Sequence, residues 1–136
     1  MANFWFQPAL RIGAIALAGL AVMFWDATAG MLVIALGMLR KVLDAFARLD
    51  AVAAAAIIRE DRAIDDEFRS ILRQLITFMM EDPRTISMAI EIVFIAKAIE
   101  RIGDHAKNIA EYVIYIVKGT DVRHTSYEFI EREAQS

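Results

Sequence analysis

Two pairs of acidic side chains stand out as residues that could do chemistry. Asp61 and Asp65 are four residues apart, and so are Glu100 and Asp104. On a helix, residues at this spacing lie on the same face, so each pair would present carboxylate oxygens one turn apart. Such oxygens can bind one hard cation or bridge two, as facing carboxylates do in di-iron helical bundles. One interpretation of the two pairs is therefore a metal site.

Ordinary salt bridges would explain the same acids without a metal. Four basic residues lie close to them along the chain, namely Arg62, Arg69, Lys97 and Arg101. Ion pairs of this kind at a surface contribute about 0 to 1 kcal/mol each. The neighbouring His105 is more often the partner of a carboxylate than a metal ligand. Both interpretations stay open from the residues alone.

The helix that would carry Glu100 and Asp104 is the clearest element in the sequence. Apolar residues recur every three or four positions over about 84–118, which predicts a helix with one buried face. Gly119 is expected to end this helix, and Gly103 to let a neighbouring helix or subunit approach closely, because a helical glycine otherwise costs about 1 kcal/mol relative to alanine. The expected stripe is Met88, Ile92, Ile95, Ile99, Ile102, Ala106, Ile109, Val113 and Ile116.

A second helix, expected over about 51–80, would carry the other acidic pair. Asp50 has the chemistry of its N-terminal cap, and Pro83 marks the turn into the next helix. Asp61 falls on the apolar line of this helix, where an unpaired aspartate is costly to bury. The other members of the expected stripe are Ile57, Ile64, Phe68, Ile71, Leu75 and Phe78.

The first third of the chain is unusually apolar. Between residues 12 and 39 the only charged side chain is Asp26. The arms 12–25 and 27–39 are each shorter than the roughly 18 to 20 residues of a membrane span, and joining them would put Asp26 near mid-bilayer at a cost of about 2.5 to 3.5 kcal/mol. A signal peptide fits no better, because the helical pattern continues past a poor cleavage site. We therefore expect a core helix here, with membrane contact as the alternative.

From residue 32 the apolar pattern predicts a third bundle helix, which ends near Leu49. Its expected stripe is Leu32, Ala35, Leu39, Val42, Phe46 and Leu49. The last segment, 121–136, is polar and charged, and we expect a mobile tail with one short helical piece.

Bulk composition narrows the classes of function. The 136 residues suffice for one domain with a real core, and their net charge of −3 does not favour nucleic acid as a partner. The absence of cysteine excludes disulfides, thiolate metal sites and a cysteine nucleophile. No phosphate-binding glycine loop and no catalytic triad signature occurs, so the sequence does not suggest an enzyme.

Several long motifs together resemble those of one protein family. The run F-I-A-K-A-I-E-R-I-G-D-H-A-K-N-I-A-E, from Phe94 to Glu111, is similar to the signature helix of the PhoU family, the phosphate-signalling accessory proteins of bacteria. Further similarity covers Met38 to Asp50, Ile57 to Asp66, Phe78 to Ile86 and Lys118 to His124. Family members normally carry two tandem three-helix repeats, and this chain resembles the second repeat.

The resemblance implies an all-α fold, an antiparallel up-and-down three-helix bundle over residues 31–120 with an extra or extended apolar N-terminal helix. Residues 1–30 would then be an atypical remnant of the first repeat, and 121–136 the tail. In the family, acidic motifs at these positions are associated with several iron or other divalent ions, such as manganese, magnesium or zinc. That association carries over to Asp61, Asp65, Glu100 and Asp104.

The function that the resemblance implies is that of a cytoplasmic adaptor, not an enzyme. It would couple the phosphate ABC transporter to its sensor histidine kinase and restrain the phosphate-starvation response. Its partners would be the transporter's ATPase subunit, the kinase and a second copy of itself in a homodimer, with contact to the membrane only through partners. Two alternatives are a metal-carboxylate protein whose ions are its purpose, and an incomplete fragment that lacks the first repeat.

Overall fold

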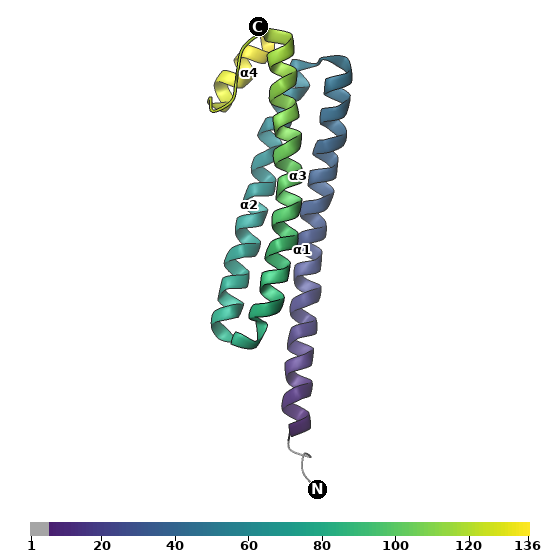
Figure 1. The fold of residues 1–136 in the computed structure, drawn as a ribbon, viewed down its shortest axis with the longest axis vertical. Helices are drawn as coiled ribbons and strands as arrows, with labels where there is room; N and C mark the ends of the chain where they lie inside the picture. The colour runs from purple at the N-terminus through teal and green to yellow at the C-terminus, as the bar shows by residue number, and fades with distance from the viewer. Residues whose placement is uncertain (1–5) are drawn as a thin grey trace.

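The described part of the chain folds into four α-helices. In this computed structural model the backbone is described from residue 6 to residue 136, and side chains from residue 18 onward with the exception of residue 20. The elements in order are α1 (Phe6–Arg48), α2 (Ala51–Glu81), the short 3-10 helix η1 (Pro83–Thr85), α3 (Ile86–Lys118) and α4 (Tyr127–Gln135). Figure 1 shows the first three long helices running up, down and up beside one another. The expected all-α, antiparallel three-helix bundle is confirmed.

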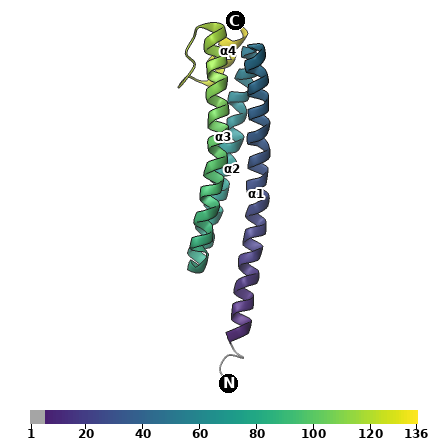
Figure 2. The same ribbon diagram turned by 45° about the vertical axis from the view of Figure 1, so that its right-hand side comes forward.

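The N-terminal apolar segment extends the first bundle helix. α1 is 43 residues long, against 31 for α2 and 33 for α3. Both ribbon views show its N-terminal part running on past the turn between α2 and α3 (Figures 1 and 2). The segment is therefore the start of α1 and not an additional helix.

The turns between helices follow the expected local chemistry. The side chain of Asp50 accepts a hydrogen bond from the backbone N–H of Ala53 at 2.9 Å and so caps α2. Asp82 adopts an extended conformation before Pro83, which begins η1. Gly119 ends α3 with φ of 72°, a left-handed conformation in which glycine carries no steric cost. Asp50, Pro83 and Gly119 thus fix the three boundaries predicted from sequence.

The buried face of α2 matches its expected stripe, whereas those of α1 and α3 are rotated. Of the residues expected on the first stripe, Leu32 and Phe46 of α1 are exposed, as is Leu49 just beyond its end. The residues of α1 that are buried are Phe24, Met31, Ala35, Met38, Val42 and Ala45. In α3 the expected core residues Ile95 and Ile116 are exposed, and small residues are buried instead, including Ala89, Ala96, Gly103, Ala106 and Ala110. Small side chains occupy this face because α3 packs closely against both other helices.

The C-terminal segment contains the short helix that the sequence predicts. Its short helix, α4, packs against α2. Ile130 and Ala134 are buried on its inner side, and Arg59 Nη2 of α2 lies 2.7 Å from Glu131 Oε1. Ser126 caps the helix by accepting a hydrogen bond from Phe129 N–H at 3.3 Å. Apolar residues three and four apart on a capped helix are therefore enough to hold this segment against the bundle.

Candidate functional site

The acidic residues lie along the contact between α2 and α3, which approach each other most closely at Gly103. A Cβ atom added to Gly103 would lie 2.7 Å from Ile64 Cδ1 and 3.4 Å from Asp61 Oδ1. Real Cβ atoms essentially never make contacts as short as the first, so a side chain at this position would displace Ile64. The steric role expected of Gly103 is confirmed, and the helix that it admits is α2.

Asp61 is buried at this contact and paired with a lysine of the opposite helix. It is only 2% exposed, and its Oδ2 lies 3.1 Å from Nζ of Lys107 on α3. Lys107 is itself half-buried, with its side chain 32% exposed. Breaking such a pair by removing one partner is strongly destabilising, because it leaves an uncompensated charge in the interior.

Burial raises the pKa of the Asp61 carboxyl above its ordinary value of 3.8, because the charged form loses its hydration. The hydrogen bond and charge of Lys107 act in the opposite direction, while the nearby charges of Asp65 and Asp104 add to the increase. For Lys107, burial alone would lower the pKa, but the hydrogen bond and charge of Asp61 outweigh it and raise the pKa above 10.5. The structure thus brings Asp61, Asp65 and Asp104 within electrostatic reach of one another.

Glu100 has a cation from its own helix. Nζ of Lys97 lies 2.5 Å from Glu100 Oε2, although this buried oxygen accepts no hydrogen bond. The same lysine lies 5.3 Å from the ring centroid of Phe68 on α2. The salt bridge expected between Lys97 and Glu100 is therefore present, and Glu100 lies toward α2 at the level of Phe68.

The other basic residues do not neutralise the acidic pairs as expected. Arg69 pairs with Asp66 at 3.3 Å, and Arg62 lies over the ring of Tyr127, 4.4 Å from its centroid. The cation that pairs with Asp61 is instead Lys107, which could not be predicted because it is distant in the chain and contacts Asp61 only when α2 and α3 pack. The position of Asp61 on an apolar stripe did indicate that it needs a partner, because an unpaired buried aspartate is costly.

The four predicted metal ligands are not gathered into one cluster in the part of the chain that is described. Among those residues, no group of three or more histidine or acidic side chains could hold an ion. Asp61, the most buried of the four predicted ligands, already has an ammonium group as its partner. In this arrangement the ammonium group of Lys107 occupies the position beside Asp61 where a metal ion would bind.

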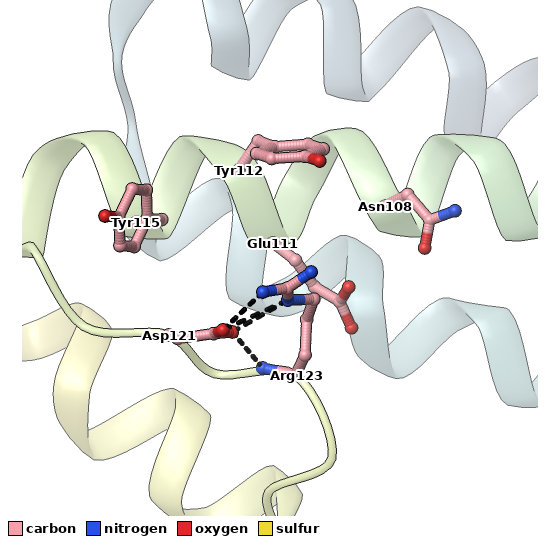
Figure 3. Close-up of a pocket in the computed structure, with 6 residues that line it drawn as sticks. All are labelled: Asn108, Glu111, Tyr112, Tyr115, Asp121 and Arg123. Atoms are coloured by element: carbon pink, nitrogen blue, oxygen red, sulfur yellow. Dashed lines mark hydrogen bonds and ion pairs between the residues drawn. The ribbon is translucent and has the colours of Figure 1, made fainter.

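A cleft opens beyond these residues, between the C-terminal part of α3 and the connection to α4. Its volume is about 380 Å³. Figure 3 shows Arg123 reaching across to Asp121, with Glu111 beside them. Arg123 Nη2 lies 2.5 Å from Asp121 Oδ2, and its hydrogen bonds hold the pKa of Asp121 down to about 2. Tyr112 and Tyr115 line the same cleft.

A second hollow of about 500 Å³ joins this cleft to the acidic residues. It is lined by Asp104 and Lys107 on one side and by His124 and Tyr127 on the other. Glu111 lines both spaces, and partial burial raises the pKa of its carboxyl even though Lys107, Arg123 and His124 act against the shift. The described surface here is a polar cleft of mixed charge, which by itself defines no reaction.

These features define a class of protein, an all-helical bundle with a charged seam, by which we mean the α2–α3 contact around Asp61, Gly103 and Lys107. Residues 28–113 match the family model described as PhoU domain. The chain belongs to the PhoU family.

Relatives of the chain carry phosphate-transport names. It is 50% identical over 98 residues to the "Phosphate-specific transport system accessory protein PhoU homolog" of Pseudomonas putida, an alignment that covers 72% of this chain and 38% of that protein. It is 50% identical over 95 residues to "Phosphate-specific transport system accessory protein PhoU" of Escherichia coli (strain K12), covering 70% and 39%.

A solved structure agrees with this relationship. The crystal structure of PhoU from Pseudomonas aeruginosa superposes with a TM-score of 0.61 at 49% sequence identity, and the match covers 64% of this chain and 42% of that one. The chain spans about two fifths of the length of the relatives that it matches.

Proposed function

We propose that the chain is a phosphate-signalling adaptor that works by binding and not by catalysis. It would couple the phosphate ABC transporter to its sensor histidine kinase and restrain the starvation response when phosphate is ample. It would do so in the cytoplasm, through contacts with the transporter's ATPase subunit and with the kinase. The seam contains a buried aspartate paired with a lysine, which is the kind of contact that holds two helices together. It therefore supports a structural role for these residues in a protein that works by binding.

The observation that carries this proposal is the identity of about 50% to accessory proteins of a phosphate-specific transport system, spread over more than two thirds of the chain. The matched region includes α2, most of α3 and the part of α1 from residue 28. The adaptor role therefore rests on the packed bundle, and α1 before residue 28 lies outside the matched region.

A co-precipitation experiment tests the proposal. The tagged full chain is incubated with the purified ATPase subunit and with the cytoplasmic part of the kinase, in parallel with a chain that starts at residue 31. Retention of either partner by the full chain supports the adaptor. Failure of both to bind, with the chain shown to be folded by its circular dichroism, contradicts it.

We also propose that two copies of the chain associate. Large apolar side chains project from the side of α1 that faces away from α2 and α3, among them Val33, Leu36 and Leu43. A second copy of the chain would present the same apolar side chains, so the two copies could cover each other at this side of α1. Light scattering should give the mass of a dimer for the wild type and of a monomer for Val33→Lys with Leu36→Lys. A polydisperse aggregate would favour the incomplete fragment instead.

A metal-carboxylate protein is the second candidate, favoured by the approach of Asp65 and Asp104 to Asp61. The ion pair with Lys107 counts against it. Metal analysis of protein purified without chelator separates the two functions. Stoichiometric iron or manganese that is lost on substitution of Asp61 and Glu100 would establish the metal centre, and metal-free protein that still binds the ATPase subunit would establish the adaptor.

A further inference from the structure

The N-terminal part of α1 extends beyond the helices that pack against the rest of it. Phe24 is the first buried side chain among those described, and its ring meets that of Phe78, near the end of α2, edge-on with centroids 5.9 Å apart. We call the helical segment before it, Phe6–Met23, the overhang. It is about 18 residues long, which corresponds to about 27 Å of helix at 1.5 Å per residue. Figures 1 and 2 show it continuing the line of α1 past the α2–α3 turn.

The sequence of the overhang is apolar at almost every position and does not alternate between an apolar stripe and a polar face. Arg11 is its only charged residue, and from Ile12 to Met23 the sequence contains only aliphatic residues, methionine and glycine. Of its described side chains, Val22 is 71% exposed and Met23 is also exposed, while no atom lies within 4 Å of a Cβ added at Gly19. A helix that is hydrophobic all round is normally buried, either in a large core or in a membrane, whereas pairing with one partner helix needs only one apolar face.

Length and charge pattern both complement a lipid bilayer. A span needs roughly 17 to 25 residues to cross a hydrocarbon core of about 30 Å. The apolar arm 12–25 alone is too short, but the helix continues N-terminally to Phe6, which brings the overhang to about 18 residues. At the bundle end, Trp25 is 76% exposed and Asp26 follows it, the residue types that occur at the headgroup level. Arg11 lies about 21 Å from Trp25 along the helix, which is about 9 Å short of the far side of the hydrocarbon core. The proposal therefore requires its long side chain to extend to the far headgroups, as arginine does near the ends of spans.

We propose that the overhang of α1 inserts into a lipid bilayer and holds the bundle directly against the membrane. Trp25, Asp26 and the α2–α3 turn then lie at the surface. The charged residues at this turn are the exposed Glu81 and Arg84 and the partly buried Asp82, which leave that end slightly acidic, so attraction to anionic headgroups does not drive insertion. The driving force is the burial of apolar surface, and binding is accordingly insensitive to salt.

The basic residues that follow the span indicate which side of the membrane the bundle occupies. Arg40 and Lys41 are the first after Trp25, and basic residues near the end of a span favour the cytoplasmic side. The bundle would thus stand in the cytoplasm with direct membrane contact, in place of contact only through partner proteins.

Vesicle flotation with a matched pair of variants tests the proposal on the full chain. Purified protein is mixed with phosphatidylcholine vesicles at high salt, without transporter or kinase, so the outcome is independent of the adaptor function. One variant carries Gly19→Lys with Val22→Lys in the overhang. The control carries Ile95→Lys with Ala98→Lys, the same charges at the same spacing on the exposed side of α3, away from the residues proposed for the dimer contact. Circular dichroism confirms that each variant is helical.

We expect the wild type and the control to float with the vesicles and the overhang variant to lose binding by more than about tenfold, because lysine is costly inside a bilayer. Three results would overturn the proposal: a wild type that stays in solution, an overhang variant that floats like the wild type, or equal loss by both variants. In cells, release of the wild-type chain from membranes by alkaline carbonate, or its recovery in a shortened form cut within α1, would also overturn it.

Discussion

The seam between α2 and α3 and the outward side of α1 use residues in opposite ways. The seam buries a charged pair and small residues, with Asp61 against Lys107 and Gly103 against Ile64. The outward side of α1 leaves large apolar residues in the open, and Val33 is 70% exposed. In this bundle, burial therefore follows how closely two helices approach and not the hydrophobicity of each residue. We therefore expect substitutions at the seam to cost the most stability, and those on the outward side of α1 to act mainly on contacts with other molecules.

The largest expected effect comes from removing the cation of the seam. Lys107→Met leaves Asp61 buried without a partner, and we expect a loss of about 2 to 4 kcal/mol in the free energy of unfolding, somewhat reduced because Lys107 is partly exposed. Urea unfolding followed by circular dichroism at neutral pH measures this loss. The double variant Asp61→Leu with Lys107→Met should recover most of it. A single variant within about 0.5 kcal/mol of the wild type would show that the seam does not depend on the pair.

Filling the closest approach should have the next largest effect. Gly103→Val adds a branched side chain where even a Cβ overlaps Ile64, and we expect a loss of about 1 to 3 kcal/mol in the free energy of unfolding. Gly103→Ala has a smaller effect, since about 1 kcal/mol of helix propensity offsets the overlap. Ile64→Val removes the Cδ1 atom that the new Cβ would overlap. This substitution should therefore lower the free energy of unfolding less in the Gly103→Ala background than in the wild type. Simple additivity of the two substitutions would contradict this geometry.

A smaller effect is expected in the pH dependence of stability. Because the pKa of Asp61 is raised above 3.8 in the folded state, the folded chain keeps this proton to a higher pH than the unfolded chain does. The contribution of Asp61 to stability therefore falls as pH rises from about 4 through its folded pKa. Urea unfolding of the wild type and Asp61→Asn over this range should show the fall only in the wild type. Parallel curves would mean that Asp61 has no raised pKa.

The smallest effect is expected on the outward side of α1. Val33→Lys with Leu36→Lys should change the free energy of unfolding by less than about 0.5 kcal/mol when measured on the monomer at low concentration, because both side chains already face solvent. A loss as large as that of Gly103→Val would mean that this side is packed within the chain, and the contrast between the two regions would fail.

The helix boundaries could be predicted because local chemistry determines them. Asp50, Pro83 and Gly119 each impose their conformation on the adjacent backbone, whatever packs against it. The buried position of Asp61 could also be predicted, since the stripe of α2 is clean enough for one misplaced acid to stand out.

The packing of α1 and α3 could not be read from the same pattern. α1 is apolar almost all round, so periodicity does not tell which side faces inward, and Met31 and Ala45 are buried where the neighbouring Leu32 and Phe46 were expected. In α3 the core side is made of alanine and glycine, which a search for large apolar residues passes over. The pairing of Asp61 with Lys107 depends on the register of two helices, which only the tertiary structure determines.

The metal site stays a prediction.

Titration of the Asp61 carboxyl by carbon-detected NMR tests most directly that this acid is held by Lys107 as part of the fold. We predict a midpoint above 3.8 in the full chain and a further rise in Lys107→Met, where burial acts without its counter-charge. A midpoint at or below 3.8 that does not respond to Lys107→Met would contradict the account.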